Sequence, residues 1–372
     1  MLRTDQLAYD LPERLIATAP AVSRDAARML VVSRSDPARL EHRTVRDLPG
    51  YLGAGDVAVF NRSRVLRARL VGARADTGGR VEGLYLDLAS GRAGAWRVLL
   101  RSNGRLRAGQ VVRLRDANGA LTDSTLSLVE RAGEAWIVWP EPSVADASAA
   151  LEAVGRTPLP PYILHARHTA GFATSDASDR ARYQTVYAEA DPAPGAGSVA
   201  APTAGLHFTP ELLERLDGAG VRRLCVDLHV GYGTFQPVQT ECVEDHPIHA
   251  ERCSAPARVA RALLDRQQSA EDGRLFAVGT TTARTLESIP DPIERWTESG
   301  WSGSTRLLIT PGYRWRRIDG MLTNFHLPRS TLLAMVAALF PGGADRLLEL
   351  YRVAVRERYR FYSFGDAMLI LP

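Results

Sequence analysis

A run of small, uncharged residues surrounds one titratable side chain in the middle of the chain. Residues 198–209 read Ser-Val-Ala-Ala-Pro-Thr-Ala-Gly-Leu-His-Phe-Thr, in which His207 is the only strong acid/base group. Small side chains let a ligand approach the backbone, whose N–H groups then become the binding surface. Thr209 followed by Pro210 is typical of a helix start, with Thr as the N-cap and Pro at the first helical position. We therefore predict a ligand-cradling loop that carries one catalytic side chain.

Two further segments place functional groups on glycine-rich loops after predicted strands. Residues 226–235 hold His229 beside two glycines, but position 236 is Gln where a dinucleotide fingerprint needs a third Gly, so a Rossmann site is not favoured. Residues 277–288 run as strand, Gly-Thr-rich turn and helix. The free N–H groups and the positive end of that helix favour an anion or carboxylate. The alternative is that the threonines only cap the helix, although capping needs one Thr rather than three.

Polar side chains also gather near the C-terminus. Residues 318–331 place Asp319, Asn324 and His326 around a predicted strand end. Residues 359–368 bring aromatic rings beside Asp366. Such rings stack on a nucleobase or pack in the core, and spacing alone does not separate the two roles.

Two cysteines and two histidines occur within a short segment. Cys242, His246, His249 and Cys253 are close enough in sequence to bind zinc. Pro247 interrupts any continuous helix between them, and the paired C-x-x-C spacing of structural zinc sites is missing. We expect no metal, and we assign these histidines a structural or substrate-contacting role.

The composition excludes several classes of protein. The chain has 372 residues, a net charge of +4 and a sequence pI near 9.1. All 46 basic residues are arginine, which rules out a Schiff-base lysine and a phosphate loop of the Gly-Lys-Ser/Thr kind. No apolar run is long enough to span a membrane, and three cysteines without a secretory segment indicate a cytoplasmic protein. The mild positive charge permits a polyanionic partner without requiring one.

The texture of the sequence changes twice along the chain. Residues 65–140 contain short alternating runs separated by Gly, Asp and Asn turns, a pattern typical of a small all-β barrel. Both flanks, 1–64 and 141–372, have a mixed α/β pattern. We predict a discontinuous α/β domain interrupted by an inserted β-barrel domain.

The segments together resemble one family, the S-adenosylmethionine:tRNA ribosyltransferase-isomerases of queuosine biosynthesis. The matching stretches keep the family order from residue 9 to the C-terminus; they are residues 9–17, 56–65, 183–187, 198–209, 229–238, 246–251, 279–288, 318–331 and 361–368. The resemblance implies an α/β barrel-like catalytic domain with an inserted small β-barrel. It also implies transfer and isomerisation of the ribosyl part of S-adenosylmethionine onto the 7-aminomethyl group of a 7-deazaguanine in tRNA. The products are epoxyqueuosine in tRNA, adenine and methionine.

On this resemblance, S-adenosylmethionine is a consumed co-substrate, no resident cofactor is expected, and tRNA is the macromolecular partner of a monomeric enzyme. Histidines suit the required proton transfers because their pKa lies near neutrality. The candidate catalytic residues are His207, His229, His326, Asp319 and Asp366, with the aspartates orienting groups or stabilising cationic intermediates. The candidate substrate-binding residues are Thr203, Gly205, Gly231, Gly233, Thr234, Thr280, Thr281, Thr282, Arg284, Asn324, Tyr183 and Gln184.

The sequence departs from the family pattern in a few places. Residues 100–109 lack the usual lysines, for which Arg105 and Arg107 are the substitutes, and Ala181 stands where an acidic residue is common. Two alternatives therefore stay open. One is a divergent paralogue that uses S-adenosylmethionine on another acceptor, and the other is a non-enzymatic RNA-binding module.

Overall fold

The computed structural model describes residues 1–143, 147–169, 175–189, 197–231, 238–268 and 273–372. The chain divides into two compact units, which we describe separately. The first unit comprises Met1–Arg62, Thr185–Ala188 and Pro202–Pro372, and the second comprises Ser63–Gln184 and Glu189–Ala201. None of the described helices is long and apolar enough to cross a membrane.

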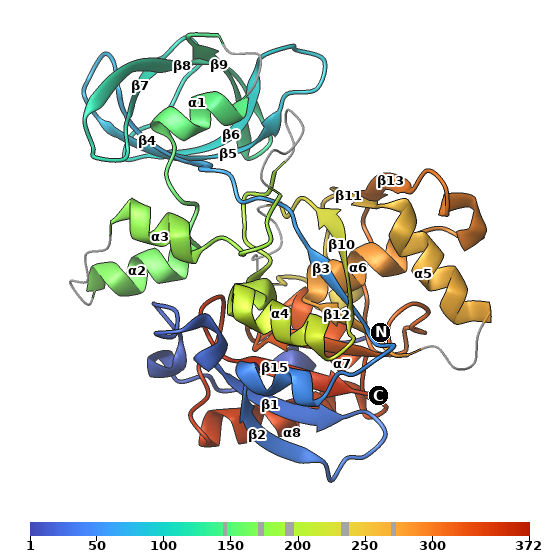
Figure 1. Cartoon of the computed structure of the whole chain (residues 1–372). Helices are drawn as coiled ribbons and strands as arrows, with labels where there is room; N and C mark the ends of the chain where they lie inside the picture. Colours follow the sequence, from blue (N-terminus) through green and yellow to red (C-terminus); the bar gives the residue numbers. More distant parts are fainter. Residues whose placement is uncertain (144–146, 170–174, 190–196, 232–237, 269–272) are drawn as a thin grey trace. The chain divides into compact units, whose positions relative to one another are not determined.

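The first unit is built on a nine-stranded mixed sheet (Figure 1). Across the sheet the strands are β13 (Trp301–Thr305), β11 (Glu251–Ala255), β10 (Arg222–Leu228), β3 (Val57–Asn61), β12 (Leu275–Val278), β14 (Gly320–Asn324), β15 (Ala367–Leu371), β1 (Arg28–Ser33) and β2 (Leu40–Thr44). The central four, β10, β3, β12 and β14, run parallel. Of these, β3 and β12 read as nearly continuous apolar runs because both of their faces are buried.

The parallel strands bring several loops to one edge of the sheet. Asn61 at the end of β3 pairs with Val226 of β10, while Phe60 pairs with Val278 at the end of β12. Asn324 ends β14 and pairs with Ala367, the first residue of the antiparallel neighbour β15. The loops after β3, β10, β12 and β14 therefore leave from the same edge, the usual position of ligand sites in such sheets.

Helices cover the two faces of this sheet. One face packs against α4 (Pro210–Gly218) and the 3-10 helix η4 (Val45–Gly50), with Phe60, Phe208 and Leu212 in the shared core. The prediction that a helix starts at Pro210 is confirmed, because the Thr209 side chain accepts a hydrogen bond from the N–H of Leu212. The remaining helices of the first unit are α5 (Ala257–Gln268), α6 (Thr280–Ser288), α7 (Thr331–Ala337), α8 (Gly343–Arg356) and the 3-10 helices η1 (Thr4–Leu7), η2 (Glu13–Leu15), η3 (Arg24–Ala26), η5 (Thr203–His207), η7 (Val243–Asp245) and η8 (Ile293–Trp296).

The mixed α/β class is confirmed, but the barrel-like closure expected for this domain is not found. In the described part of the chain the edge strands β13 and β2 do not pair with each other. The strand order runs from one edge to the other without closing, so the sheet is open. The pattern of apolar residues along a strand distinguishes parallel from antiparallel strands. Whether a sheet closes into a barrel depends instead on pairing between its two outermost strands, which no local pattern encodes.

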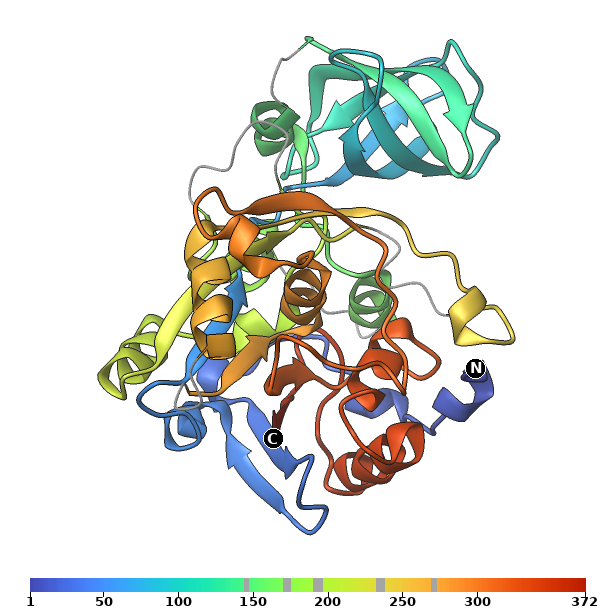
Figure 2. The same cartoon turned by 90° about the vertical axis from the view of Figure 1, so that its right-hand side faces the viewer.

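The second unit contains a closed six-stranded barrel, whose strands are drawn in blue to green in Figure 2. Around the barrel the order is β4 (Arg69–Arg74), β5 (Arg80–Leu88), β6 (Trp96–Ser102), β9 (Ala135–Glu141), β8 (Leu121–Ala132) and β7 (Val111–Arg115). Alternate residues point inward, so Val98, Val112, Leu126 and Val138 fill the interior. The helices of this unit are α1 (Ala147–Val154), α2 (Pro161–Thr169) and α3 (Asp176–Arg182).

The second unit extends beyond the boundary expected from the sequence. The strand texture ends near residue 140, but the unit continues to Gln184. Helix α1 packs Ala147, Leu151 and Val154 into the same apolar cluster as the barrel side chains. Because this helix buries its apolar face against the barrel, it belongs to the barrel unit rather than to the α/β domain.

Candidate functional site

The candidate site lies where the parallel strands of the first unit end. Asn61, the last residue of β3, is fully buried. Its side-chain amide donates to the carbonyl of Leu228 at 3.1 Å, and its oxygen accepts from the N–H of Leu228 at 3.2 Å. The same amide lies 3.3 Å from Oγ1 of Thr281, at the start of α6. Asn61 thus ties together the ends of β3 and β10 and the first turn of α6.

His207 and Asn324 meet at the end of β14. Asn324 Nδ2 lies 3.3 Å from His207 Nε2 and donates to the carbonyl of Tyr362 at 3.1 Å. The carbonyl of Tyr362 can only accept, so the NH2 group of Asn324 faces it and His207 Nε2 is an acceptor. The Oδ1 atom of Asn324 is buried and has no partner among the described residues. An orphaned acceptor inside a protein is costly, so this atom marks a place where a ligand can donate.

His207 is held in its neutral form. Its side chain is 4 % exposed, and burial, with a contribution from the charge of Arg360, lowers its pKa to about 4. A hydrogen bond with the backbone of Arg24 acts in the opposite direction. The Arg24 guanidinium itself donates to the carbonyl of Leu206 at 3.2 Å. At neutral pH the imidazole is therefore unprotonated, as a general base requires, and its Nε2 lone pair accepts the hydrogen bond from Asn324.

The stretch 198–209 is not one continuous loop. Its first four residues belong to the second unit, whereas residues 203–207 form the 3-10 helix η5 in the first unit. Thr203 begins this turn, and Gly205 lies within it. A Cβ on Gly205 would lie 1.9 Å from the Tyr187 hydroxyl, so glycine is required for this close approach. The glycine thus allows close packing against Tyr187, and the turn around it is mostly buried.

His326 follows β14 in a fully buried environment. Its Nε2 atom lies 2.9 Å from Thr323 Oγ1, and its N–H donates to the Tyr351 hydroxyl at 2.9 Å. The Tyr9 hydroxyl donates to the carbonyl of His326 at 2.5 Å. Burial lowers the pKa of the His326 imidazole to about 4. These contacts fix the ring on its loop at the same sheet edge as Asn324.

Protein stability is expected to fall between pH 6.5 and pH 5 because His207 and His326 are neutral when folded. Both have pKa values near 4 in the folded chain against 6.5 when exposed, so in this window the unfolded state binds more protons. Each histidine then contributes a loss of up to about 1.4 kcal/mol per pH unit as the pH falls. Urea unfolding at several pH values measures the slope. Replacing His326 by Gln should remove the part of this slope that His326 contributes. An unchanged slope would contradict the lowered pKa of His326.

The first turn of α6 is uncapped by any side chain. Its N-cap is Gly279, which has φ +91°, a conformation that side chains rarely adopt. Thr282 Oγ1 donates to the carbonyl of Val278 at 2.8 Å, and Thr281 Oγ1 faces Asn61. The alternative that the threonines cap the helix is therefore wrong. The N–H groups of Thr280, Thr281 and Thr282 form a buried positive helix end, as an anion site requires.

A buried ion pair lies beside this turn. Arg284 of α6 pairs with Glu251, the first residue of β11, and the two side chains are 8 % and 6 % exposed. Glu251 Oε1 also accepts the N–H of Gly231 at 2.7 Å. Burial lowers the pKa of Arg284 to about 10, so the guanidinium stays charged at neutral pH. The pair connects α6 and β11 to the loop that follows β10.

His229 lies at the same edge, half-buried after β10, with its N–H bonded to the carbonyl of Arg252 at 2.9 Å. The structure thus gathers most of the expected residues on one side of the sheet in the first unit. These are His207, His229, His326, Asn324, Thr203, Gly205, Gly231, Thr280, Thr281, Thr282 and Arg284. Gly233 and Thr234 lie outside the described residues.

Two predicted aspartates have structural partners instead. Asp319 precedes β14, about 17 Å along the strand from Asn324, so it lies at the opposite edge of the sheet. Its carboxylate accepts from Arg266 and from the N–H of Leu275. Asp366 does lie near the site edge, but its oxygens accept the backbone N–H groups of Arg28 and Arg360 at 3.0 and 2.7 Å. The position of Asp319 does not support its expected role in stabilising cationic intermediates, whereas that role of Asp366 stays a prediction.

Tyr183 and Gln184 are described with the second unit, and their predicted contact with the substrate stays a prediction. Both belong to the second unit, where the Gln184 side chain pairs with the backbone of Val65 at 3.2 and 3.3 Å. The described residues contain no cluster of three or more histidine, cysteine or acidic side chains arranged to hold a metal.

Sequence reasoning did not single out Asn61, Glu251 or Tyr187 as site residues. Asn61 had a usable signal, because a lone polar residue directly after a buried apolar strand marks a strand end. Glu251 and Tyr187 end two of the stretches that resemble the family, but their roles depend on contacts with Arg284 and Gly205, which are distant in sequence.

A family model described as queuosine biosynthesis protein matches residues 4–370. The chain belongs to the queuosine biosynthesis protein family. Two members of this family are similar over nearly their whole length, and both are named S-adenosylmethionine:tRNA ribosyltransferase-isomerase. The protein of Rubrobacter xylanophilus is 46% identical over 373 residues, covering 100% of this chain and 98% of its own. That of Gloeobacter violaceus is 47% identical over 369 residues, covering 99% and 96%.

A solved structure supports membership of the queuosine biosynthesis family. The crystal structure of an S-adenosylmethionine tRNA ribosyltransferase from Thermotoga maritima is 32% identical in sequence to this chain. The two align with a TM-score of 0.51, covering 98% of this chain and 100% of the other. The resemblance drawn from the motifs is thereby confirmed.

Proposed function

We propose that this enzyme transfers and isomerises the ribosyl group of S-adenosylmethionine onto the 7-aminomethyl group of 7-aminomethyl-7-deazaguanine in tRNA. The products are epoxyqueuosine in tRNA, adenine and methionine. One observation carries the proposal: full-length relatives with this activity in their names share up to 47% of the sequence. In this proposal S-adenosylmethionine is consumed, no resident cofactor takes part, and the enzyme is a cytoplasmic monomer acting on tRNA.

The site residues of the first unit suit the proton transfers of this reaction. A base must remove the acidic proton beside the sulfonium, a donor must assist the departure of adenine, and the attacking amine must lose a proton. His207 is neutral and lies beside the orphaned Asn324 Oδ1, so we assign it the role of base. His229 and His326 at the same edge are the candidates for the other two transfers.

The first turn of α6 suits the methionine part of the co-substrate. Its backbone N–H groups carry positive partial charge and directly follow the N-cap Gly279, which has no side chain to keep a carboxylate away from the backbone. The charged Arg284 lies one turn further along the helix. We assign the methionine carboxylate to the N–H groups of Thr280–Thr282. We assign to Asn324 Oδ1 the role of accepting a hydrogen bond that the nucleoside donates.

One assay tests the proposed function. The protein is incubated with S-adenosylmethionine and a tRNA that carries the aminomethyl-deazaguanine, and the nucleosides are then analysed by mass spectrometry. The expected result is epoxyqueuosine together with equimolar adenine. Release of adenine only in the presence of another acceptor would indicate a divergent paralogue. Binding of tRNA with neither product would indicate an RNA-binding module.

A further inference from the structure

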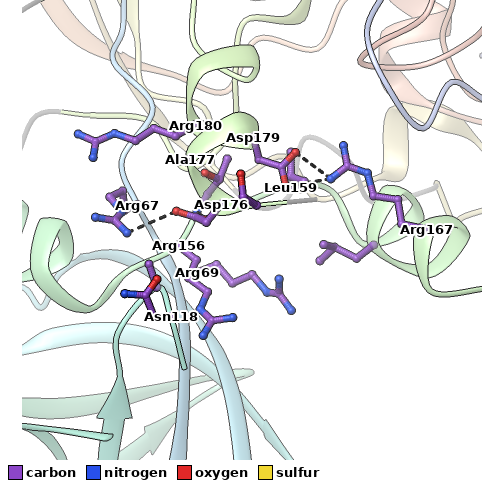
Figure 3. A pocket seen from close by; sticks show the side chains of 14 residues that line it. Arg67, Arg69, Asn118, Arg156, Leu159, Arg167, Asp176, Ala177, Asp179 and Arg180 are labelled. Carbon is purple, nitrogen blue, oxygen red and sulfur yellow. Dashed lines mark hydrogen bonds and ion pairs between the residues drawn. The ribbon is translucent and has the colours of Figure 1, made fainter. Parts of the chain in front are cut away.

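The second unit contains a pocket that the proposed chemistry does not use. It has a volume of about 620 Å³ and is shown in Figure 3. Its lining comes from five parts of the unit: residues before and within β4, the turn after β7, the segment after α1, and the helices α2 and α3. Five of the lining residues are arginines: Arg67, Arg69, Arg156, Arg167 and Arg180.

The two acidic residues of the pocket are already neutralised. Asp176 pairs with Arg67 at 3.4 Å, and Asp179 pairs with Arg167 at 2.8 Å, as the dashed lines in Figure 3 mark. All four side chains are at most 15 % exposed, so these pairs are well shielded from solvent. The charges within each pair cancel, so the remaining arginines give the pocket a net positive charge.

Arg156 has the least compensated charge of the remaining three. Among the described residues it has no carboxylate partner, and its guanidinium donates to the carbonyl of Asp116 at 2.9 Å. Its Nε atom is buried without a partner, and so is the hydroxyl of the adjacent Thr157, a residue that is only 6 % exposed. Unfilled donors of this kind favour a ligand that supplies acceptor oxygens.

The other two arginines are paired only with partly exposed carboxylates outside the pocket lining. Arg69 pairs with Glu82 at 3.2 Å and Arg180 with Glu152 at 2.7 Å. The two glutamate side chains are 38 % and 45 % exposed, so solvent screens these pairs and each is weak. An anion in the pocket competes with them at small cost.

We propose that this pocket binds a phosphodiester group of the tRNA backbone, with Arg156 as the principal contact. The proposal rests on the proposed function for the identity of the nucleic acid. Arginine presents several donors in a planar fork that matches a phosphate. None of the described residues that line the pocket is aromatic, so these residues offer no surface on which a base would stack. Contacts of this kind position a nucleic acid and contribute affinity without reading its sequence.

The test measures tRNA binding by fluorescence anisotropy over a range of salt concentrations, with Arg156→Gln and two companion variants. Arg156→Gln should weaken binding roughly tenfold at low salt and reduce the slope of log K against log salt by about 1. Asn118→Asp places a negative charge in the same pocket on an isosteric side chain and should also weaken binding. Arg131→Gln is the matched control, because Arg131 also donates to one backbone carbonyl, that of Gly133, but does not line the pocket.

In turnover assays, Arg156→Gln should raise KM for tRNA while leaving KM for S-adenosylmethionine and kcat unchanged. Wild-type affinity and salt slope in both pocket variants would overturn the proposal. So would an equal loss in Arg131→Gln, which would show that only total charge matters. Stabilisation of the wild-type chain by inorganic phosphate with no loss of tRNA binding in the variants would likewise overturn it. Since binding is measured without turnover, failure of the wild-type enzyme to make epoxyqueuosine would refute the proposed function and leave this test intact.

Discussion

Replacing His207 by Ala is expected to lower the turnover number by about 10² to 10⁴ fold, the usual contribution of a positioned acid/base group. The imidazole is buried, its pKa of about 4 keeps it neutral, and Asn324 holds its Nε2 atom. The measurement is single-turnover formation of epoxyqueuosine, with thermal unfolding to show that the variant is folded. His42→Ala is the control, because His42 is exposed on edge strand β2 and lies outside the candidate site.

A second variant separates catalysis from folding at this position. Asn324→Asp replaces a donor to His207 Nε2 with a carboxylate, which favours the protonated ring and raises its pKa. If His207 is the base, the acidic limb of the pH–rate profile should move to higher pH in Asn324→Asp. An unmoved limb, or near-normal turnover in His207→Ala, would remove His207 from the catalytic group.

Replacing Arg284 by Met is expected to lower the free energy of unfolding by about 3–5 kcal/mol, the range observed when one partner of a buried ion pair is removed. The substitution takes the guanidinium away from the Glu251 carboxylate, which is 6 % exposed and cannot recover the lost interaction from bulk water. Methionine fills much of the same space, so the effect is one of charge rather than of cavity formation. Urea unfolding at pH 7 measures it.

The control for this effect is an ion pair of the same type at the surface. Arg223 and Asp217 form a pair in which the side chains are 33 % and 47 % exposed, and Arg223→Met should cost at most about 1 kcal/mol. Similar losses for the two variants would show that the burial of Glu251 and Arg284 has no energetic consequence. The double variant Arg284→Met, Glu251→Gln should recover part of the lost stability, because it removes the isolated charge.

The site could be predicted from the sequence where its residues follow buried strands directly. Asn324 ends β14, His229 directly follows β10, and the Thr280–Thr282 turn begins two residues after β12, and the structure brings these strand ends to one edge. The prediction of Asp319 as a site residue is wrong, because Asp319 precedes β14 instead of following it. The motif 318–331 spans the whole of β14, so it contains residues from both ends of the strand. Only the direction of the strand in the sheet shows which of them reach the site.

The sequence by itself determined the family, the mixed α/β class, the small barrel and the loops that carry the histidines. Local signals suffice for these, since hydrophobic period, turn residues and helix caps act over a few residues. The tertiary structure decided that the main sheet is open, that α1 belongs with the barrel, and that Glu251 lies beside Arg284. It also showed that residues 198–209 divide between the two units and that His207 is buried and neutral. Each of these depends on contacts between segments far apart in the chain, whose burial and pairing energies no local pattern records.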